Sequence, residues 1–255
     1  MLKEARQAAI LEAVTARGSC TVIELARALS VSDETIRRDL KAMARNGAVR
    51  KVHGGVRLAE SLRESGYHQR LAENVEAKRA IARRAAREVA DGDSLMLDTG
   101  STTAYVARAL TEHRDLMIAT NSVDIARTLA TRNGNRVYMA GGELRADDGA
   151  ALGPVATAFV RQFRVRLAFL SMAAIDAVDG LMDYHLSEAE FSRVVMERAE
   201  RTIVVADGSK FGTRALVRVA GLAAVDTLIT EAPPPPPFDS LLAEAGIAVV
   251  IAPPL

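Results

Sequence analysis

The 255-residue sequence has one cysteine, four histidines and no long apolar run. A lone cysteine, Cys20, excludes an internal disulfide and a cysteine-rich zinc site, and it fits a reducing cytoplasm. The histidines form no pair at metal-ligand spacing, so we expect no metal site and no cofactor. No stretch of 18 apolar residues could span a bilayer, and the N-terminus lacks the apolar core of a signal peptide. We therefore expect a cytoplasmic protein with no membrane partner.

Charge is distributed unevenly along a chain whose net charge is only +1. Residues 1–57 contain 11 Lys and Arg against 6 Asp and Glu, whereas residues 58–255 contain 22 against 26. A basic module joined to an acidic body is the electrostatic footprint of DNA binding. With 49% hydrophobic residues, the chain can bury a substantial core and is long enough for two domains.

Residues 30–57 contain the most specific pattern. Ser32 occupies a helix N-cap position, and the two acidic residues after it lie at the positive end of the helix dipole. Apolar residues at i, i+4 and i+7 predict a buried stripe: Ile36, Leu40 and Met43. The residues expected to contact DNA bases lie on the outer side and flanks of this helix: Thr35, Arg37, Arg38 and Lys41. Such a helix suits the DNA major groove.

The neighbouring segments complete a DNA-binding domain. A helix is predicted over residues 3–16, and Thr21 with Glu24 forms a capping box for a second helix that ends near Ser30. That spacing is typical of a helix-turn-helix. Residues 48–52 and 56–58 are predicted as a hairpin wing that contacts the DNA backbone through basic residues: Arg50, Lys51, His53 and Arg57. A basic helix face alone is usually only solvated surface, but this ordered combination predicts a winged helix-turn-helix domain over residues 1–57 that binds a double-stranded DNA operator.

The rest of the sequence predicts an α/β domain. Residues 58–74 are polar and irregular and are expected to be a linker. From there, helical patterns alternate with short strands at 94–97, 117–119, 136–140, 167–170, 202–206, 227–230 and 248–251. This alternation predicts a mostly parallel sheet over residues 75–255.

Several of the predicted strands end in small polar residues, where open α/β sheets bind their ligands. The loop 98–103, followed by a helix, would offer N–H groups, hydroxyls and a positive dipole end to an anion. Lys210 could add a positive charge for a phosphate, and Asp98 or Asp176 could accept from sugar hydroxyls. Each feature alone is common in turns and surfaces, but together they favour a pocket for a phosphorylated small molecule. The candidate effector residues are Asp98, Gly100, Ser101, Thr102, Thr103, Asn121, Gly141, Gly142, Glu143, Asp176 and Lys210.

The order of these motifs resembles the DeoR family of bacterial transcriptional regulators over almost the whole chain. The matching residues include Ser32-x-x-Thr35-Ile36-Arg37-Arg38-Asp39-Leu40, Val52-His53-Gly54-Gly55, Asp98-x-Gly100-Ser101-Thr102-Thr103, Thr120-Asn121-Ser122 and Asp207-x-Ser209-Lys210. The resemblance implies a sensor domain shaped like ribose-5-phosphate isomerase, which binds a sugar phosphate and controls DNA affinity. Because helix-turn-helix proteins generally bind paired half-sites as dimers, we also expect a homo-oligomer, a dimer or a tetramer.

Other residues resemble family members that control glycerol 3-phosphate metabolism. These are Arg145-x-x-Asp148-Gly149, Gln162-Phe163-Arg164 and Gly180-Leu181-Met182-Asp183-Tyr184 with Glu188. They favour glycerol 3-phosphate as the effector. Two segments depart from the family pattern: residues 171–176 lack its usual glycines, and residues 185–187 differ as well. Other phosphorylated sugars and polyols therefore stay open as effectors.

Two functions are compatible with these motifs. One is a DNA-binding regulator, expected to be a repressor whose DNA affinity is lowered by the phosphorylated effector. The other is a sugar-phosphate isomerase-like enzyme that carries a DNA-binding domain. An isomerase needs a positioned base, for which Asp98, Glu143 and Asp176 are candidates, but fold resemblance alone does not confer chemistry. We predict a regulator and no enzymatic activity.

Overall fold

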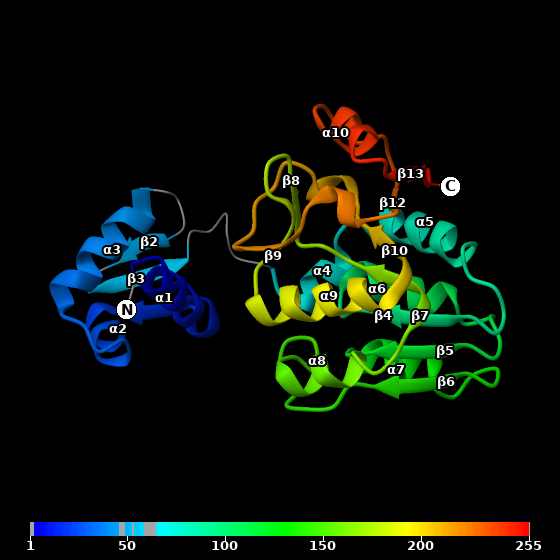
Figure 1. The fold of residues 1–255 in the computed structure, drawn as a ribbon, viewed down its shortest axis with the longest axis horizontal. Helices are drawn as coiled ribbons and strands as arrows, with labels where there is room; N and C mark the ends of the chain where they lie inside the picture. The colour runs from blue at the N-terminus through cyan, green and yellow to red at the C-terminus, as the bar shows by residue number, and fades with distance from the viewer. Residues whose placement is uncertain (1–2, 46–48, 53, 59–64, 255) are drawn as a thin grey trace. The chain divides into compact units, whose positions relative to one another are not determined.

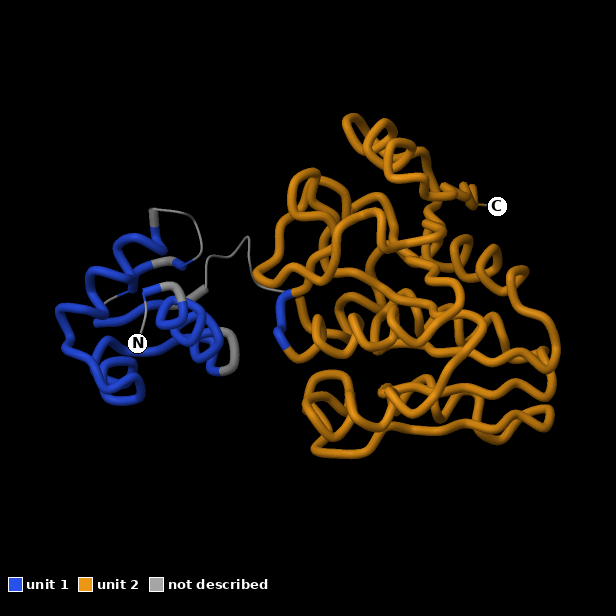
Figure 2. Tube along the Cα trace, in the orientation of Figure 1, with its two compact units in different colours: residues 1–64, 184–186 blue, residues 65–183, 187–255 orange. Residues whose placement is uncertain are grey.

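The computed structural model describes residues 3–45, 49–52, 54–58 and 65–254. The chain forms two compact units, residues 1–64 with 184–186 and residues 65–183 with 187–255 (Figure 2). Among the described residues, no helix is long and apolar enough to cross a membrane.

The N-terminal unit combines helices with a small antiparallel sheet (Figure 1). Its helices are α1 (Lys3–Arg17), α2 (Val22–Ala28) and α3 (Asp33–Arg45). Its strands are β1 (Ser19–Thr21), β2 (Val49–Val52) and β3 (Gly55–Leu58), in the order β1-β3-β2. Helices α2 and α3 follow each other at the predicted spacing, and β2 and β3 form the predicted hairpin.

Local hydrogen bonds explain where α2 and α3 begin. The Thr21 hydroxyl accepts from the Glu24 N–H at 3.2 Å, and the Glu24 carboxylate accepts from the Thr21 N–H at 2.7 Å. This is the predicted capping box. The Ser32 hydroxyl accepts from the Thr35 N–H at 3.3 Å, which confirms the predicted N-cap of α3. The apolar stripe of α3 is buried as predicted, at Ile36, Leu40 and Met43.

One strand of this unit has no counterpart among the predicted elements. Cys20 lies in β1, where its buried thiol donates to the Ala13 carbonyl at 3.5 Å. A three-residue strand has no hydrophobic pattern of its own and forms only because β3 pairs with it. The approach is close: a Cβ atom on Gly55 would lie 2.4 Å from the Cys20 carbonyl oxygen.

The C-terminal unit is built on a seven-stranded sheet in which all neighbouring strands are parallel. Its order is β13-β12-β10-β7-β4-β5-β6. The strands are β4 (Ser94–Leu97), β5 (Met117–Thr120), β6 (Arg136–Met139), β7 (Val165–Leu170), β10 (Ala199–Val205), β12 (Thr227–Thr230) and β13 (Ala248–Ile251). The predicted α/β class with a mostly parallel sheet is confirmed.

Helices cover both faces of this sheet. One hydrophobic cluster includes side chains of α5 (Val75–Ala86), α6 (Ser101–Ala109) and α7 (Val123–Leu129). The other includes side chains of α8 (Pro154–Val160), α9 (Leu186–Arg198) and α10 (Phe238–Glu244). Successive residues of β4 alternate between them: Leu95 and Leu97 join the first cluster and Met96 joins the second. Burial on both faces explains why the central strands, such as β4, are mostly apolar.

Some elements of the C-terminal unit were not predicted. A second, antiparallel sheet contains β8 (Ala174–Asp176), β9 (Gly180–Asp183) and β11 (Val217–Ala220), and 3-10 turns form at Gly208–Lys210 and Leu222–Ala224. Residues 58–74 are expected to be a linker, but Tyr67–Ala72 forms helix α4. So short a helix is unstable alone. Tertiary bonds hold it, because the Tyr105 hydroxyl and the Lys78 ammonium donate to carbonyls at its C-terminal end.

Candidate functional site

The outer side of α3 carries the predicted base-contacting cations. Arg37, Arg38 and Lys41 are exposed, and Thr35 is half-buried beside the Ser32 cap. The one acidic residue in the middle of this helix, Asp39, is buried and paired with Arg6 of α1. Arg6 therefore compensates the charge of Asp39. The exposed charged side chains in the middle of α3 are cations, as phosphate and base contacts require.

The wing carries the remaining predicted DNA contacts. Lys51 of β2 is exposed, and Arg50 lies opposite Arg57 in the β2–β3 register. Gly54 has a φ of +73° in the turn between the strands, a conformation that favours glycine. His53 lies outside the described residues.

The carboxyl ends of β4, β5 and β7 bring three of the predicted polar segments together. From β4 the chain adds β5 and β6 on one side and then returns to add β7 on the other, so β4 and β7 flank the topological switch point. There both Asp98 carboxylate oxygens accept from the Ser171 N–H, at 3.0 and 3.2 Å. The Asn121 side-chain oxygen accepts from the Thr99 N–H at 2.9 Å. Open α/β sheets bind ligands at such a point.

Helix α6 begins at the same place. Gly100 is its N-cap residue and provides no side chain to cap the first N–H groups. Ser101, Thr102 and Thr103 are buried, and the Thr103 hydroxyl donates to the Asp98 carbonyl at 2.9 Å. An uncapped N-terminus presents N–H groups and the positive end of the helix dipole, which together favour an anion.

A small cavity lies at these strand ends. Its volume is ≈ 10 Å³, and it is lined by Asp98, Thr99, Asn121, Leu152, Asp183, Glu188, Phe191 and Ser192. A cavity of that size holds roughly one water molecule. A sugar phosphate would therefore have to widen it. Asp183 at the end of β9 and Glu188 in the first turn of α9 are part of its lining.

The loop after β6 contacts two residues that line the cavity, through side chains that were not predicted as site residues. Gly141, Gly142 and Glu143, which were predicted, are exposed. Two residues farther along, the Arg145 guanidinium binds the carboxylates of Asp148 (Nε–Oδ1, 2.9 Å) and Glu188. The Thr99 hydroxyl also donates to Asp148, at 3.3 Å. The sequence signal for the Arg145–Asp148 pair was its two opposite charges three residues apart.

Burial and these ion pairs set the charge of the site. Burial raises the pKa of Asp98 well above its usual range; the Ser171 N–H opposes that shift, and the Glu188 charge adds to it. Burial would also raise the pKa of Asp148, but the hydrogen bonds and charge of Arg145 hold that pKa below its usual range. The Arg145 guanidinium compensates the negative charges of Asp148 and Glu188.

The segment after β10 forms a separate polar group. Buried Asp207 accepts from the Ser209 N–H at 3.0 Å and from the Asn74 side chain at 3.1 Å. Lys210 is half-buried. Burial lowers the pKa of nearby Lys78; the Asp207 charge raises it and the Lys210 charge lowers it further. Because only β7 separates β10 from β4, the carboxyl ends of β10 and β4 are about 10 Å apart, two strand spacings.

Asp176 lies in β8 rather than in the parallel sheet. Its carboxylate accepts from the N–H groups of Val178 and Asp179, at 2.8 and 2.9 Å, and from Arg214 at 2.9 Å. These bonds close the β8–β9 turn. The hydrogen bonds from the Asp179 N–H and from Arg214 lower the pKa of Asp176 below its usual range, although burial opposes that shift. The structure thus gives Asp176 a local structural role.

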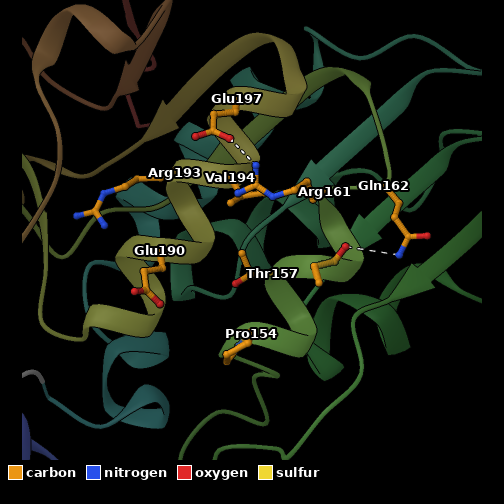
Figure 3. A pocket seen from close by; sticks show the side chains of 9 residues that line it. Pro154, Thr157, Arg161, Gln162, Glu190, Arg193, Val194 and Glu197 are labelled. Carbon is orange, nitrogen blue, oxygen red and sulfur yellow. Dashed lines mark hydrogen bonds and ion pairs between the residues drawn. The ribbon is translucent and has the colours of Figure 1, made fainter.

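A second hollow lies elsewhere, between α8 and α9. This outer groove has a volume of ≈ 640 Å³ and is lined by residues such as Pro154, Thr157, Arg161 and Glu197 (Figure 3). Figure 3 shows the Arg161–Glu197 ion pair (3.0 Å) across it. None of the predicted effector residues lines the groove. The smaller cavity, by contrast, lies at the switch point and is lined by two of the predicted effector residues, Asp98 and Asn121. Within the described part of the chain, no group of three His, Cys, Asp or Glu residues is placed to hold a metal ion.

Comparison with protein families agrees with this two-part arrangement. A model of the DeoR-like helix-turn-helix domain matches residues 6–62, and a model of the DeoR C terminal sensor domain matches residues 73–232. The chain belongs to the DeoR family of transcriptional regulators. The helix-turn-helix unit that carries α3 and the sensor unit that carries the cavity are therefore the two halves of a DeoR-type protein, as the sequence resemblance predicted.

Relatives within the DeoR family match over nearly the whole chain. The glycerol-3-phosphate regulon repressor of Escherichia coli (strain K12) is 36% identical over 235 residues, which cover 92% of this chain and 93% of that protein. The HTH-type transcriptional repressor CsqR of the same organism is 33% identical and covers 95% and 93%. Among solved structures, the ribose 5-phosphate isomerase from Plasmodium falciparum aligns over 55% of this chain and 54% of its own, at 19% identity and a TM-score of 0.38.

Proposed function

We propose that this protein is a repressor whose DNA affinity falls when a phosphorylated polyol or sugar binds at the β4–β7 switch point. One observation carries the proposal: the strand-end residues Asp98, Asn121 and Ser171 meet beside the uncapped N-terminus of α6. The names of the relatives support the repressor part, since both are repressors.

In the DNA-binding unit, helix α3 and the wing would contact different parts of the DNA. Arg37, Arg38 and Lys41 lie on an exposed, anchored helix face and would read base edges in the major groove. The wing residues Arg50, Lys51 and Arg57 would hold the phosphate backbone. His53, which lies outside the described residues, is also proposed as a DNA contact. The protein would bind paired half-sites as a homo-oligomer, a dimer or a tetramer.

The effector's phosphate would lie at the N-terminus of α6, against Ser101, Thr102 and Thr103, with Lys210 as the neighbouring positive charge. The N–H groups and hydroxyls there suit an anion. The separation of about 10 Å between the β4 and β10 strand ends fits a small sugar or polyol phosphate between them. Its hydroxyl groups would lie toward Asp98 and Asn121. Glycerol 3-phosphate is the favoured effector, because a relative of similar length is named for the glycerol-3-phosphate regulon.

Effector binding would act on the chain that leads to the DNA-binding unit. The loop that supplies Arg145 and Asp148 to the site also supplies Asp147, whose carboxylate accepts from the Tyr67 N–H at 2.9 Å. Tyr67 opens α4, the first described helix after residues 59–64. Widening the cavity would shift this loop and with it the start of α4. Linkage requires that the effector binds more weakly to the DNA complex by the factor by which it weakens DNA binding, typically about 5–150-fold.

A DNA-shift titration tests the proposal. Glycerol 3-phosphate is expected to release operator DNA, whereas glycerol without the phosphate is not. Release by a hexose phosphate but not by glycerol 3-phosphate would change the effector and leave the class of function standing. Release by glycerol alone would contradict the phosphate site. Conversion of ribose 5-phosphate to a product would instead favour the isomerase-like alternative, in which buried Asp98 would be the candidate base.

A further inference from the structure

Helix α4 is capped by a side chain from a distant part of the chain. Its own N-cap residue, Gly66, has no side chain with which to cap it, and six residues are too few for a helix that is stable alone. A carboxylate oxygen of Asp147 instead accepts from the Tyr67 N–H at 2.9 Å. This bond satisfies a backbone donor that the helix leaves free and places negative charge at the positive end of its dipole.

Asp147 belongs to a turn that borders the proposed effector site. The next residue, Asp148, accepts at 3.3 Å from the hydroxyl of Thr99, which lines the cavity at the switch point. Asp148 is also bound by Arg145, and the Gly149 N–H donates to the Arg145 carbonyl at 2.8 Å, which closes the turn over residues 145–149. The cap of α4 and the ion pair beside the cavity are therefore carried by the same turn.

The rest of α4 is held by other elements. The Tyr67 hydroxyl donates to Asp124 of α7 at 3.2 Å, and the Tyr105 hydroxyl of α6 donates to the Leu71 carbonyl at 3.1 Å. Tyr67 is buried, so its ring is held among these neighbours. The first turn of α4 therefore keeps its cap only while the turn 145–149 keeps its position relative to α7.

We infer that Asp147 is a positioning residue that couples the effector site to the DNA-binding unit by capping α4. The Arg70 guanidinium donates to the Ser65 carbonyl at 2.5 Å, so the formed helix also positions the residues before it. An effector that widens the cavity displaces the turn 145–149, removes the cap and lets the first turn of α4 open. The inference rests on the proposed function and adds the residue through which the effector acts.

Removing the cap tests the inference without any ligand. Asp147→Ala should speed hydrogen exchange of the α4 amides about 2–30-fold, the effect expected from the loss of an N-cap. It should also lower operator affinity about 2–30-fold, because it places α4 in its effector-bound state. Asp147→Asn should behave like the wild-type protein, because asparagine caps helices as well as aspartate does. That rescue separates a capping role from an effect of charge.

Glu112→Ala is the matched control. Glu112 is exposed between α6 and β5, at the amino-terminal edge of the parallel sheet, which is opposite the proposed site. Its replacement removes the same negative charge, which by itself should leave operator affinity unchanged or raise it slightly. Exchange is measured by mass spectrometry on the full-length protein. Helix α10 is the internal reference, because it is similarly short and packs on the face of the sheet opposite α6.

Glycerol 3-phosphate provides the second arm of the experiment. Added to the wild-type protein, it should speed exchange in α4 about 2–30-fold and leave α10 unchanged. In Asp147→Ala the first turn is already open, so the compound should speed exchange no further and should change operator affinity less than in the wild-type protein. Its calorimetric affinity for this variant should be equal or higher, because binding no longer has to displace the cap.

The outcomes separate this inference from the proposed function. If glycerol 3-phosphate neither binds nor changes operator affinity, the proposed effector fails, and the ligand-free comparison still decides the inference. Wild-type operator affinity in Asp147→Ala, or the same loss in Asp147→Asn as in Asp147→Ala, would overturn the inference alone. An α4 whose exchange does not respond to a compound that releases DNA would overturn it as well.

Discussion

Replacing Gly100 by alanine should loosen the junction between β4 and β7. A Cβ atom at this position would lie 1.9 Å from the Ser171 hydroxyl oxygen, 2.9 Å from the Ser171 Cβ and 3.1 Å from the Thr103 hydroxyl oxygen. The hydroxyl could rotate away, but the Ser171 Cβ is fixed to the backbone. The φ of Gly100 is 175°, an extended conformation that alanine also adopts, so the expected effect is steric and free of backbone strain.

Overpacking of this kind costs about 1–3 kcal/mol in free energy of unfolding. For a unit of this size the melting temperature should fall by about 2–12 °C. Because the sequence has no tryptophan and three of its four tyrosines, Tyr67, Tyr105 and Tyr138, belong to the C-terminal unit, tyrosine fluorescence reports mainly on that unit. The variant should also lose its response to effector, since Gly100 and Ser171 border the switch point.

Two further variants isolate the cause. Gly141→Ala adds a Cβ that meets nothing within 4 Å, so its stability should match the wild-type protein or rise slightly. Combining Gly100→Ala with Ser171→Gly removes the obstructing side chain and should restore most of the lost stability, a coupling of about 0.5–3 kcal/mol. A Gly100→Ala protein with the wild-type melting temperature, or a double variant without recovery, would refute the close approach.

Three more predictions concern the DNA surface, the phosphate site and the buried ion pair. Arg38→Ala should weaken operator binding about 5–150-fold and relax base preference, whereas Lys51→Ala should weaken all sequences alike and lower the salt slope by about one; equal, sequence-blind losses in DNA titrations would contradict that division. Ser101→Asp should abolish effector-induced release but not DNA binding, because its carboxylate would repel the phosphate; calorimetric binding at wild-type affinity would count against it. Asp148 has a lowered pKa, so its stabilising contribution is present above the unfolded pKa of about 3.9 and is lost as the pH falls through the folded value. The difference in unfolding free energy between wild type and Asp148→Asn should therefore be full at pH 7 and shrink below about pH 4, whereas a pH-independent difference would exclude the ion pair with Arg145 as its source.

Much of the architecture could be read from local patterns. The cap at Ser32, the capping box at Thr21 and the stripe through Ile36 were predicted, and the structure contains all three. Each depends on residues three to seven apart, whose relative positions a helix dictates. The seven parallel strands were predicted from short apolar, β-branched runs separated by helical patterns, which the central strands owe to burial on both faces. The candidate loop 98–103 was predicted from its strand-to-helix position.

The remaining elements depend on partners far along the chain. Strand β1 exists through pairing with β3, and α4 is held by Tyr105 and Lys78. The β8–β9–β11 sheet likewise has no periodic signal long enough to predict it. Short segments of this kind gain their stability from tertiary contacts, and local sequence patterns do not predict those contacts.

The sequence alone determined the order of domains, the DNA-binding helix and its cap, the parallel sheet and the family, because these follow from local periodicity and motif spacing. Only the tertiary structure decided which polar residues form the site. It joined Asp98 to Ser171, 73 positions away, and Arg145 to Glu188. It also assigned Asp176 to a turn beside Arg214. Strand order sets these neighbours, and strand order follows from how distant segments pack rather than from any residue's local surroundings.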